Sequence, residues 1–250
     1  MNNHIKSILL ILFCSLCSLS LSAQSKSKAD TAYAAEQYET ALNIYKQLAE
    51  QGPSVEVYYN LGNCYYRLDD IAHAILWYER AQLLCPGDDD VRFNLRLART
   101  KTADKIIPEE ELFFVRWYYS LLNTMSASGW ARTGIVLFVL VLLAFGMYFF
   151  GMSLTLRKAG FYGGVALLVL VLATNLMAWH QSARQNNHDR GIFVESSAPV
   201  KSTPSDNGTD LFVIHAGTAM QIVDSMKDWY QVRLSDGKEG WLPASVIELI

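Results

Sequence analysis

Residues 55–86 read VEVYYNLGNCYYRLDDIAHAILWYERAQLLCP, and this stretch decides the first fold in the chain. Its apolar residues recur at helical spacing on both sides of a polar centre, which predicts two antiparallel helices. The small residues Gly62, Ala74 and Ala81 fall where two such helices touch most closely, and the aromatic residues fill the gaps around them. Pro86 ends the second helix, because proline cannot continue a helical hydrogen-bond ladder.

The spacing in this stretch resembles that of the tetratricopeptide repeat. The repeat has aromatic, Leu-Gly, Tyr, Ala, aromatic, Ala and Pro at fixed places, and the residues at those places here are Tyr58, Leu61, Gly62, Tyr65, Ala74, Tyr78, Ala81 and Pro86. A second unit lies upstream and carries Ala41, Tyr45, Leu48 and Pro53, with its first helix expected over about residues 27–36. We therefore predict an all-α tetratricopeptide repeat array over residues 24–106.

A third, partial unit begins at Asp89 and keeps Asn94, Leu95 and Ala98. It has Arg96 and Arg99 where the family has Gly and Tyr. Repeat arrays end in atypical units with a polar outer face, so we predict a terminal capping helix here.

The resemblance implies a concave groove, lined by the first helix of each repeat, that binds peptides. The groove-facing positions of the best repeat are Glu56, Tyr59, Asn63 and Tyr66. An asparagine can hydrogen-bond a peptide backbone, and tyrosines offer flat apolar area with a polar tip. The alternative is that these tyrosines only pack between repeats.

Two hydrophobic segments, residues 133–152 and 160–179, are each long enough to cross the hydrocarbon core of a bilayer. Between Thr133 and Trp179 the only charged residues are Arg157 and Lys158, which fall in the connection over residues 153–159. Short basic loops stay on the cytoplasmic side of a membrane. We therefore predict a two-helix transmembrane hairpin with a cytoplasmic loop.

The N-terminal segment, residues 1–23, has one lysine, an apolar run and small residues before a hydrophilic stretch. This layout predicts a secretory signal peptide that is cleaved after Ala23, and the alternative is an uncleaved anchor helix. An exported N-terminal domain agrees with a basic loop on the cytoplasmic side, and after cleavage of the signal peptide both ends of the chain are expected on the outer side.

Two further features accompany the hairpin. Gly160 and Gly164 form a Gly-x-x-x-Gly pair, which lets a helix approach closely, either from another chain or from the first span of this one. Residues 107–132 precede the hairpin and are expected to form an interfacial amphipathic helix, since apolar residues share one face with Arg116 and Trp117 beside them.

After a polar linker over residues 180–189, the pattern changes to the period of two that is typical of strands. Five strands are expected over residues 190–250, at 192–194, 212–215, 220–224, 230–234 and 239–242. Five short strands predict a small all-β barrel, because closure removes exposed edges.

The β segment resembles bacterial SH3-like domains, and the ending Gly240-Trp241-Leu242-Pro243 carries much of the resemblance. Such domains bind peptides or cell-wall fragments, which implies an aromatic ligand platform formed by Trp229, Tyr230 and Trp241. The alternative is that at least one of the two tryptophans belongs to the core.

Composition and motifs exclude several classes of function. The chain has 21 Lys+Arg and 24 Asp+Glu, so no basic surface for nucleic acid is expected. The five histidines do not stand at metal-ligand spacing with carboxylates or thiols, and no phosphate loop or nucleophile elbow is present. We therefore expect no catalytic residues, no metal and no cofactor.

The whole order is similar to that of the Bat aerotolerance operon protein E family of Bacteroidetes, in which a signal peptide, repeats, a hairpin and an SH3-like tail follow one another. This resemblance implies a bacterial inner-membrane protein with both termini in the periplasm. It also implies partners among von Willebrand A-domain Bat membrane proteins and a MoxR-type ATPase, besides membrane lipid. We predict a noncatalytic scaffold or adaptor, and the alternative is a protein that senses or binds peptidoglycan.

Overall fold

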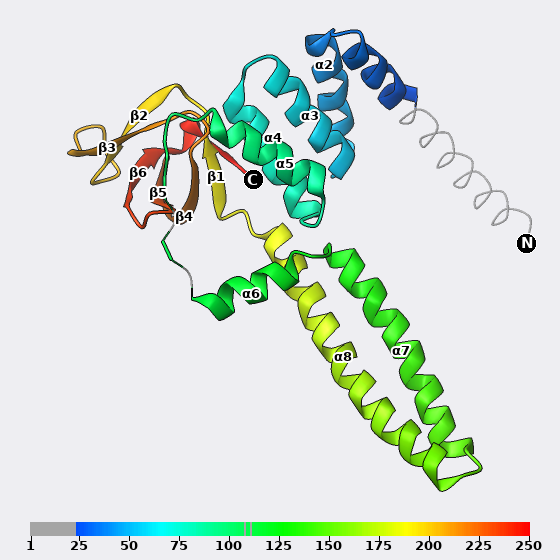
Figure 1. Cartoon of the computed structure of the whole chain (residues 1–250). Coiled ribbons are helices and arrows are strands. Elements are labelled where there is room, and N and C mark those ends of the chain that lie inside the picture. The colour runs from blue at the N-terminus through cyan, green and yellow to red at the C-terminus, as the bar shows by residue number, and fades with distance from the viewer. Residues whose placement is uncertain (1–23, 108, 111) are drawn as a thin grey trace, which may run out of the picture. The chain divides into compact units, whose positions relative to one another are not determined.

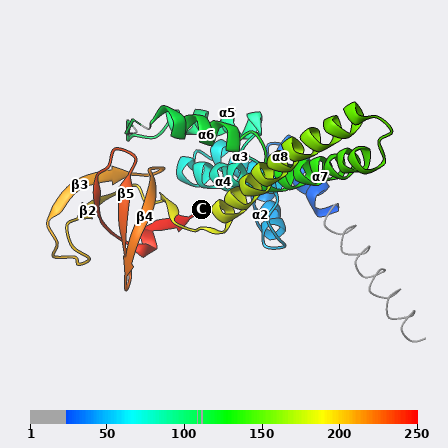
Figure 2. The ribbon, with the colours of Figure 1, turned by 90° about the horizontal axis from the view of Figure 1, so that it is seen from below.

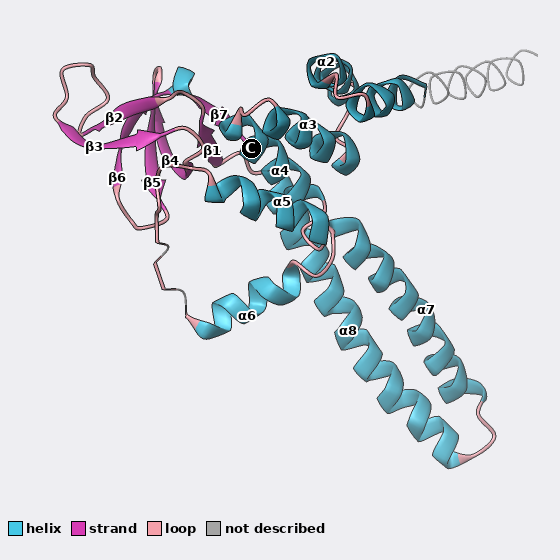
Figure 3. Ribbon diagram, turned by 45° about the horizontal axis from the view of Figure 1, so that its top comes forward, coloured by secondary structure: helices cyan, strands magenta, loops and turns pink. Residues whose placement is uncertain are grey.

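The computed structural model describes residues 24–107, 109–110 and 112–250. The expected signal peptide lies outside these residues. Helices occupy the described chain as far as residue 186, and strands begin at residue 190 (Figure 3). The chain divides into two compact units, and the first contains the repeats together with the sheet, while the second contains the two long helices.

The repeats form antiparallel helices in sequence order (Figure 1). After a helix over residues 24–34 come α2 (Tyr38–Ala49), α3 (Val55–Arg67), α4 (Ile71–Leu84) and α5 (Asp89–Thr100). Side chains cap two of them at their first turn: Ser54 Oγ accepts from the Val57 amide at 3.4 Å, and Asp70 Oδ1 accepts from the His73 amide at 3.2 Å. These bonds satisfy amides that have no partner within their own helix.

Small residues set the distance between α3 and α4, as the sequence predicts. A Cβ atom added to Gly62 would lie 2.5 Å from the ring of Tyr78, so only glycine allows this approach. Ala74 and Ala81 of α4 are fully buried. The helix α5 buries Val91, Leu95 and Ala98 on one face only, as a capping helix does.

The C-terminal segment forms one antiparallel sheet of seven strands rather than five. They are β1 (Arg190–Phe193), β2 (Ser197–Lys201), β3 (Asp210–His215), β4 (Ala219–Met226), β5 (Trp229–Leu234), β6 (Glu239–Pro243) and β7 (Ile247–Leu249). The hydrogen-bonded order is β3-β2-β6-β5-β4-β1-β7, and β2, β3, β4 and β5 are labelled in Figure 2.

The expected five-stranded barrel needs correction in two respects. Strand β2 contains Pro199 and β7 has three residues after a short 3-10 turn, so neither shows a clear alternating pattern. The sheet also has two edge strands, β3 and β7, which are not hydrogen-bonded to each other. Its hydrogen bonding is therefore that of an open sheet and not of a closed barrel.

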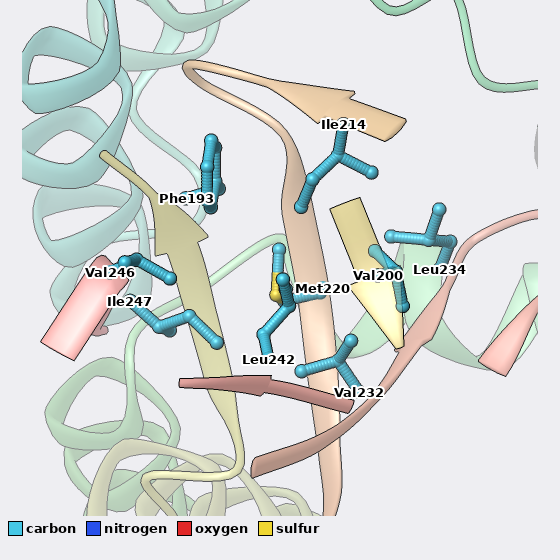
Figure 4. Packing of buried hydrophobic residues seen from close by; sticks show 9 residues of the cluster. All are labelled: Phe193, Val200, Ile214, Met220, Val232, Leu234, Leu242, Val246 and Ile247. Atoms are coloured by element: carbon cyan, nitrogen blue, oxygen red, sulfur yellow. The ribbon is translucent and has the colours of Figure 1, made fainter. Parts of the chain in front are cut away.

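The core of the sheet collects one or two inward residues from each strand (Figure 4). The cluster is Phe193, Val200, Ile214, Met220, Val232, Leu234, Leu242, Val246 and Ile247. Gly240 lets β6 approach β2, because a Cβ there would lie 2.4 Å from Val200 Cγ1. Burial of these apolar side chains is the main force that holds so small a domain together.

Polar contacts join the sheet to the repeats within the first unit. Asp104, which follows α5, accepts hydrogen bonds from the His215 amide, His215 Nδ1 and Thr218 Oγ1 at 2.7, 2.8 and 2.7 Å. From α4, His73 Nε2 lies 3.3 Å from Glu248 Oε1, and Arg80 Nη2 donates to the Leu249 carbonyl at 2.5 Å. The sheet therefore lies against the last two helices of the array.

A buried carboxylate adds to this contact. Glu79 of α4 is 3% exposed, and its side chain is paired with Arg99 of α5 and, at 3.8 Å, with Arg190 of β1. A charge this deep needs such partners, since burial without them is costly.

The second unit contains α6 (Phe113–Leu122), α7 (Ala127–Phe150) and α8 (Leu154–Asn186). The side chains of Ser126 and Ser153 cap the two long helices. Both helices are long and apolar enough to cross a membrane by length and composition. Helix α7 covers the predicted segment 133–152 as far as Phe150, and α8 contains the whole of 160–179. They run side by side (Figures 1 and 2).

The helices of this unit do not coincide with the segment boundaries expected from the sequence. Helix α8 begins inside the expected loop 153–159 and continues through most of the expected linker 180–189, because no Gly or Pro interrupts residues 179–186. Helix α6 begins only at Phe113, since residues 109–110 and 112 are exposed and bury no face that would reward a helix.

In the hairpin, the kinds of residue that are buried and exposed are the reverse of those in a water-soluble domain. Its buried residues are mostly small or polar, among them Gly134, Gly160, Gly164, Thr174 and Gln181. Large apolar side chains such as Ile135, Leu143, Val169 and Leu172 are exposed. Such an arrangement is typical of helices whose outer face meets lipid.

Candidate functional site

A cavity of about 310 Å³ lies in the helical repeats. Four helices contribute its walls, with Tyr33 from residues 24–34, Tyr59, Asn63, Tyr66 and Arg67 from α3, Tyr78 from α4, and Asn94 and Leu97 from α5. We call these eight residues the groove. Its volume is in the lower range of small-ligand sites, and a peptide would place one or two side chains in it.

A hydrogen-bond network fixes the floor of the groove. Tyr78 Oη donates to Asn63 Oδ1 at 2.7 Å, and Asn94 Nδ2 donates to Asn63 Oδ1 at 3.1 Å and to Tyr59 Oη at 2.8 Å. Two donors thus occupy the carbonyl oxygen of Asn63. What the side chain offers a ligand is its amide N–H groups, which can donate to a peptide carbonyl.

Burial raises the pKa of the Tyr78 hydroxyl strongly, and the neighbouring tyrosines add to this effect. Tyr78 therefore stays protonated and keeps donating to Asn63. The rings of Tyr59 and Tyr78 lie 6.0 Å apart at a tilt of 47°, within the range of favourable aromatic pairs.

Cationic side chains flank the aromatic surface. Lys101 Nζ lies 4.3 Å from the centre of the Tyr66 ring, a cation–π contact, and it also pairs with Asp69 at 3.3 Å. The Arg67 guanidinium is hydrogen-bonded to Tyr33, which raises its pKa further. The groove is thus aromatic inside, with the cations Arg67 and Lys101 beside its rings.

Three of the four predicted groove residues, Tyr59, Asn63 and Tyr66, line the same cavity. The fourth, Glu56, does not line it. Its carboxylate pairs with Lys26 at 2.8 Å, and Lys26 also pairs with Asp30 at 3.0 Å, so Glu56 tethers the helix of residues 24–34 to α3.

Sequence reasoning missed Tyr33, Arg67, Tyr78, Asn94 and Leu97 as groove residues. These side chains come mostly from neighbouring helices, so an offset within a single repeat does not find them. The sequence does contain one indication of Asn94. It stands in the third unit at the position that Asn60 occupies in the preceding repeat.

In the sheet, the predicted platform divides between two faces. Gln231 pairs with Trp241 and Trp229 pairs with Pro243, and alternate residues of a strand share a face, so Trp229 and Trp241 lie on one face of the β5–β6 ladder. Both are partly exposed. Tyr230 pairs with Leu242 on the opposite face and packs against the core cluster.

The two predicted packing glycines lie between α7 and α8. A Cβ on Gly160 would be 2.6 Å from the Ala144 carbonyl oxygen and 2.7 Å from the Tyr148 amide nitrogen. Gly164 faces Ala144 and Phe145 at about 3.5 Å. The pair therefore serves the approach of the two spans of one chain, which is one of the two alternatives left open by the sequence.

Among residues 24–107, 109–110 and 112–250, the structure has no group of three or more His, Cys, Asp or Glu side chains placed to hold a metal ion. The histidines of the first unit are engaged otherwise. His73 and His215 each bind a carboxylate at the contact between the repeats and the sheet.

Comparison with known families defines the two classes of module. A family model for the tetratricopeptide repeat matches residues 27–89, and one for the bacterial SH3 domain matches residues 196–248. A comparison with curated proteins gave no match. The groove thus lies in a tetratricopeptide repeat domain, and the tryptophan face lies in a bacterial SH3 domain, both of which are typically binding modules.

Proposed function

We propose that this chain is a noncatalytic scaffold that binds an extended peptide segment of a partner protein in the groove. The observation that carries the proposal is the groove itself, in which rings from several helices surround the donor groups of Asn63. Flat tyrosine rings suit apolar or proline side chains, and the rim formed by Arg67 and Lys101 suits an acidic residue beside them.

We further propose that α7 and α8 anchor the scaffold in the bacterial inner membrane, with both modules on the periplasmic side. Exposed apolar side chains and buried small ones support insertion. The cations Arg157 and Lys158, at the turn of the hairpin, support a cytoplasmic turn. Exposed Phe113, Phe114 and Trp117 on α6 suit a helix at the membrane interface.

The partners that the Bat family resemblance implies are von Willebrand A-domain membrane proteins and a MoxR-type ATPase system. A role in an aerotolerance or stress complex follows from that resemblance alone. The groove is the part of the chain through which we expect such a partner to be recruited.

Crosslinking in intact cells, followed by quantitative mass spectrometry, tests the groove. The variant Tyr66→Ala removes a ring from the wall, and we expect recovery of the main partner to fall about tenfold, since one well-packed aromatic contributes about 1.4 kcal/mol to binding. Phe93→Ala is the matched control, because Phe93 is an exposed aromatic on α5 outside the groove. Equal recovery with Tyr66→Ala and wild type would overturn peptide binding in the groove.

A second candidate function is cell-wall binding by the sheet. The observation that favours it is the shared, partly exposed face of Trp229 and Trp241 in a bacterial SH3 domain. Purified sacculi should then sediment the full-length chain, and Trp229→Ala should release it. The scaffold proposal expects no sedimentation with wild type.

Reporter fusions test the orientation. A phosphatase fused after Ile250 is expected to be active in the periplasm, and one placed at Met152 is expected to be inactive. The reverse pattern would place both modules in the cytosol and would contradict the proposed periplasmic location.

A further inference from the structure

A second cavity, of about 500 Å³, lies at the turn of the hairpin in the second unit. The end of α7 and the first three turns of α8 form its walls, with Tyr148, Phe149, Leu154, Arg157, Lys158, Phe161 and Tyr162. We call these residues the turn pocket. Its volume lies within the range of sites that bind small molecules.

The turn pocket is positively charged. Its lining contains two cations, Arg157 and Lys158, and no carboxylate. The Nε atom of Arg157 donates to the Gly151 carbonyl at 2.9 Å, which ties the side chain to the turn. That bond uses Nε and not the two Nη groups, and a planar guanidinium can offer those to the oxygens of one phosphate.

The rest of the pocket is aromatic. Tyr148 contacts the rings of Phe149 and Phe161 at centroid distances of 5.1 and 5.6 Å, and Phe161 contacts Tyr162 at 5.5 Å. Phe149 and Tyr162 are 68% and 69% exposed, so their rings present large uncovered faces. Such rings are suited to the glycerol and first acyl carbons at the border of a bilayer.

We propose that the turn pocket binds the headgroup of an anionic phospholipid. The phosphate lies between Arg157 and Lys158, and the glycerol and upper acyl chains contact the aromatic rings. Charge complementarity favours an anionic lipid over a zwitterionic one, and the aromatic walls favour a lipid over free phosphate. The proposal rests on the proposed insertion of α7 and α8 in a membrane.

The test uses the full-length chain in phosphatidylcholine vesicles that contain a trace of spin-labelled lipid. Flotation of the vesicles shows whether the protein is inserted. Electron paramagnetic resonance then compares how strongly spin-labelled phosphatidylglycerol and spin-labelled phosphatidylcholine associate with it. Both leaflets have the same composition, so a variant that changes orientation does not change the result.

We expect phosphatidylglycerol to associate more strongly than phosphatidylcholine with the wild type. Arg157→Gln and Lys158→Gln are each expected to lower that preference about fivefold. Arg132→Gln is the matched control, because Arg132 is an exposed arginine near the other end of the hairpin, and it is expected to leave the preference unchanged. Tyr162→Leu is expected to weaken the association while the charges remain.

If the protein floats with the vesicles, three outcomes would contradict lipid binding in the turn pocket. They are equal association of the two lipids, an effect of Arg132→Gln as large as that of Arg157→Gln, and full displacement of the lipid by soluble glycerol phosphate. A protein that does not float contradicts membrane insertion itself, and the lipid site with it, but leaves peptide binding in the groove to its own test.

Discussion

The two units of this protein use opposite packing rules. In the first unit, large apolar side chains such as Tyr45, Leu61 and Phe193 are buried, and ion pairs join the sheet to the repeats. In the hairpin, glycines and a threonine are buried and the leucines are exposed. Burial of apolar area drives folding in water, whereas close contact between backbones is typical of helices that associate in lipid.

The first unit also contains specific polar contacts between its two modules. Hydrogen bonds to Asp104 and the buried Glu79 specify one position of the sheet against α4 and α5. The groove and the tryptophan face therefore belong to the same compact unit.

The largest effect is expected from Gly160→Leu in the hairpin. A side chain there meets the backbone at Ala144 and Tyr148, which cannot yield as a flexible side chain would. We expect a loss of about 3 kcal/mol or more, because the two helices must separate. Thermal unfolding in detergent measures it, and Gly163→Leu is the control, since nothing lies within 4 Å of a Cβ at Gly163.

The next largest effect is expected from Asp104→Ala, which leaves three donors of the sheet without their acceptor. The loss is expected to be about 2–3 kcal/mol, as for hydrogen bonds to a charged group. Burial raises the pKa of Asp104, but hydrogen bonds from Thr218 and His215 outweigh it and hold the pKa below its usual value.

The sign of the pH dependence follows from that lowered pKa. The contribution of Asp104 is present above the pKa of the unfolded chain, near 3.8, and is lost as the pH falls through the lower folded value. Acid unfolding of the wild type should therefore be steeper below about pH 4 than that of Asp104→Ala. Identical acid curves would contradict the assigned role.

A smaller effect is expected from Gly217→Ala, in the turn between β3 and β4 that packs on the repeats. The residue has φ +86°, and an added Cβ would lie 2.8 Å from Thr102 Cγ2 and 3.0 Å from Ile75 Cδ1. An alanine in this left-handed backbone conformation costs about 1–2 kcal/mol more than glycine. The side chains of Thr102 and Ile75 can move and relieve part of the close contact. Calorimetry should place this variant between Asp104→Ala and wild type, and Gly146→Ala, with open space around it, is the control.

The smallest effect is expected from His73→Gln. The hydrogen bond to Asp70 raises the pKa of His73, and Glu248 on β7 adds to it, while burial opposes both. Its contribution is fully present below the unfolded pKa, near 6.5, and is lost as the pH rises through the higher folded value. Two cations lie near these carboxylates. Lys46 of α2 acts on Asp70, and Arg80 of α4 lies near Glu248.

We expect His73→Gln to remove about 0.5–1 kcal/mol at acidic pH and almost nothing at alkaline pH. Hydrogen exchange of the β7 amides, followed across that range, measures this difference. An equal loss at both ends would show that His73 acts by packing on Tyr65 and not by charge.

Much of the fold was predictable, because periodicity reports which face of an element is buried. The helices α2 to α5, the two apolar helices and five of the seven strands follow from such patterns. Strands β2 and β7 were missed because a proline and a length of three residues give no alternation to read. Helix α8 extends beyond the predicted span 160–179 on both sides, and polar residues that continue a helix cannot be told from a linker by their pattern.

The candidate site was predictable only in part. Tyr59, Asn63 and Tyr66 follow from the repeat pattern, since one helix places them on one face. The pattern also suggested Glu56, but its charge is taken up by Lys26, a residue of another helix. Tyr33 and Asn94 reach the groove from elements that are distant in the sequence.

The amino-acid sequence alone determined the order of modules, the small residues where helices touch, and the reversal of polarity in the hairpin, because these depend on local spacing and side-chain size. The tertiary structure decided which residues share the groove, the separate faces of Trp229 and Tyr230, and the docking of Asp104 on His215 and Thr218. The groove collects side chains from four separate helices, and Asp104 contacts residues more than a hundred positions away. The pairing of Trp229 with β6 depends on strand register, so no single local pattern encodes these features.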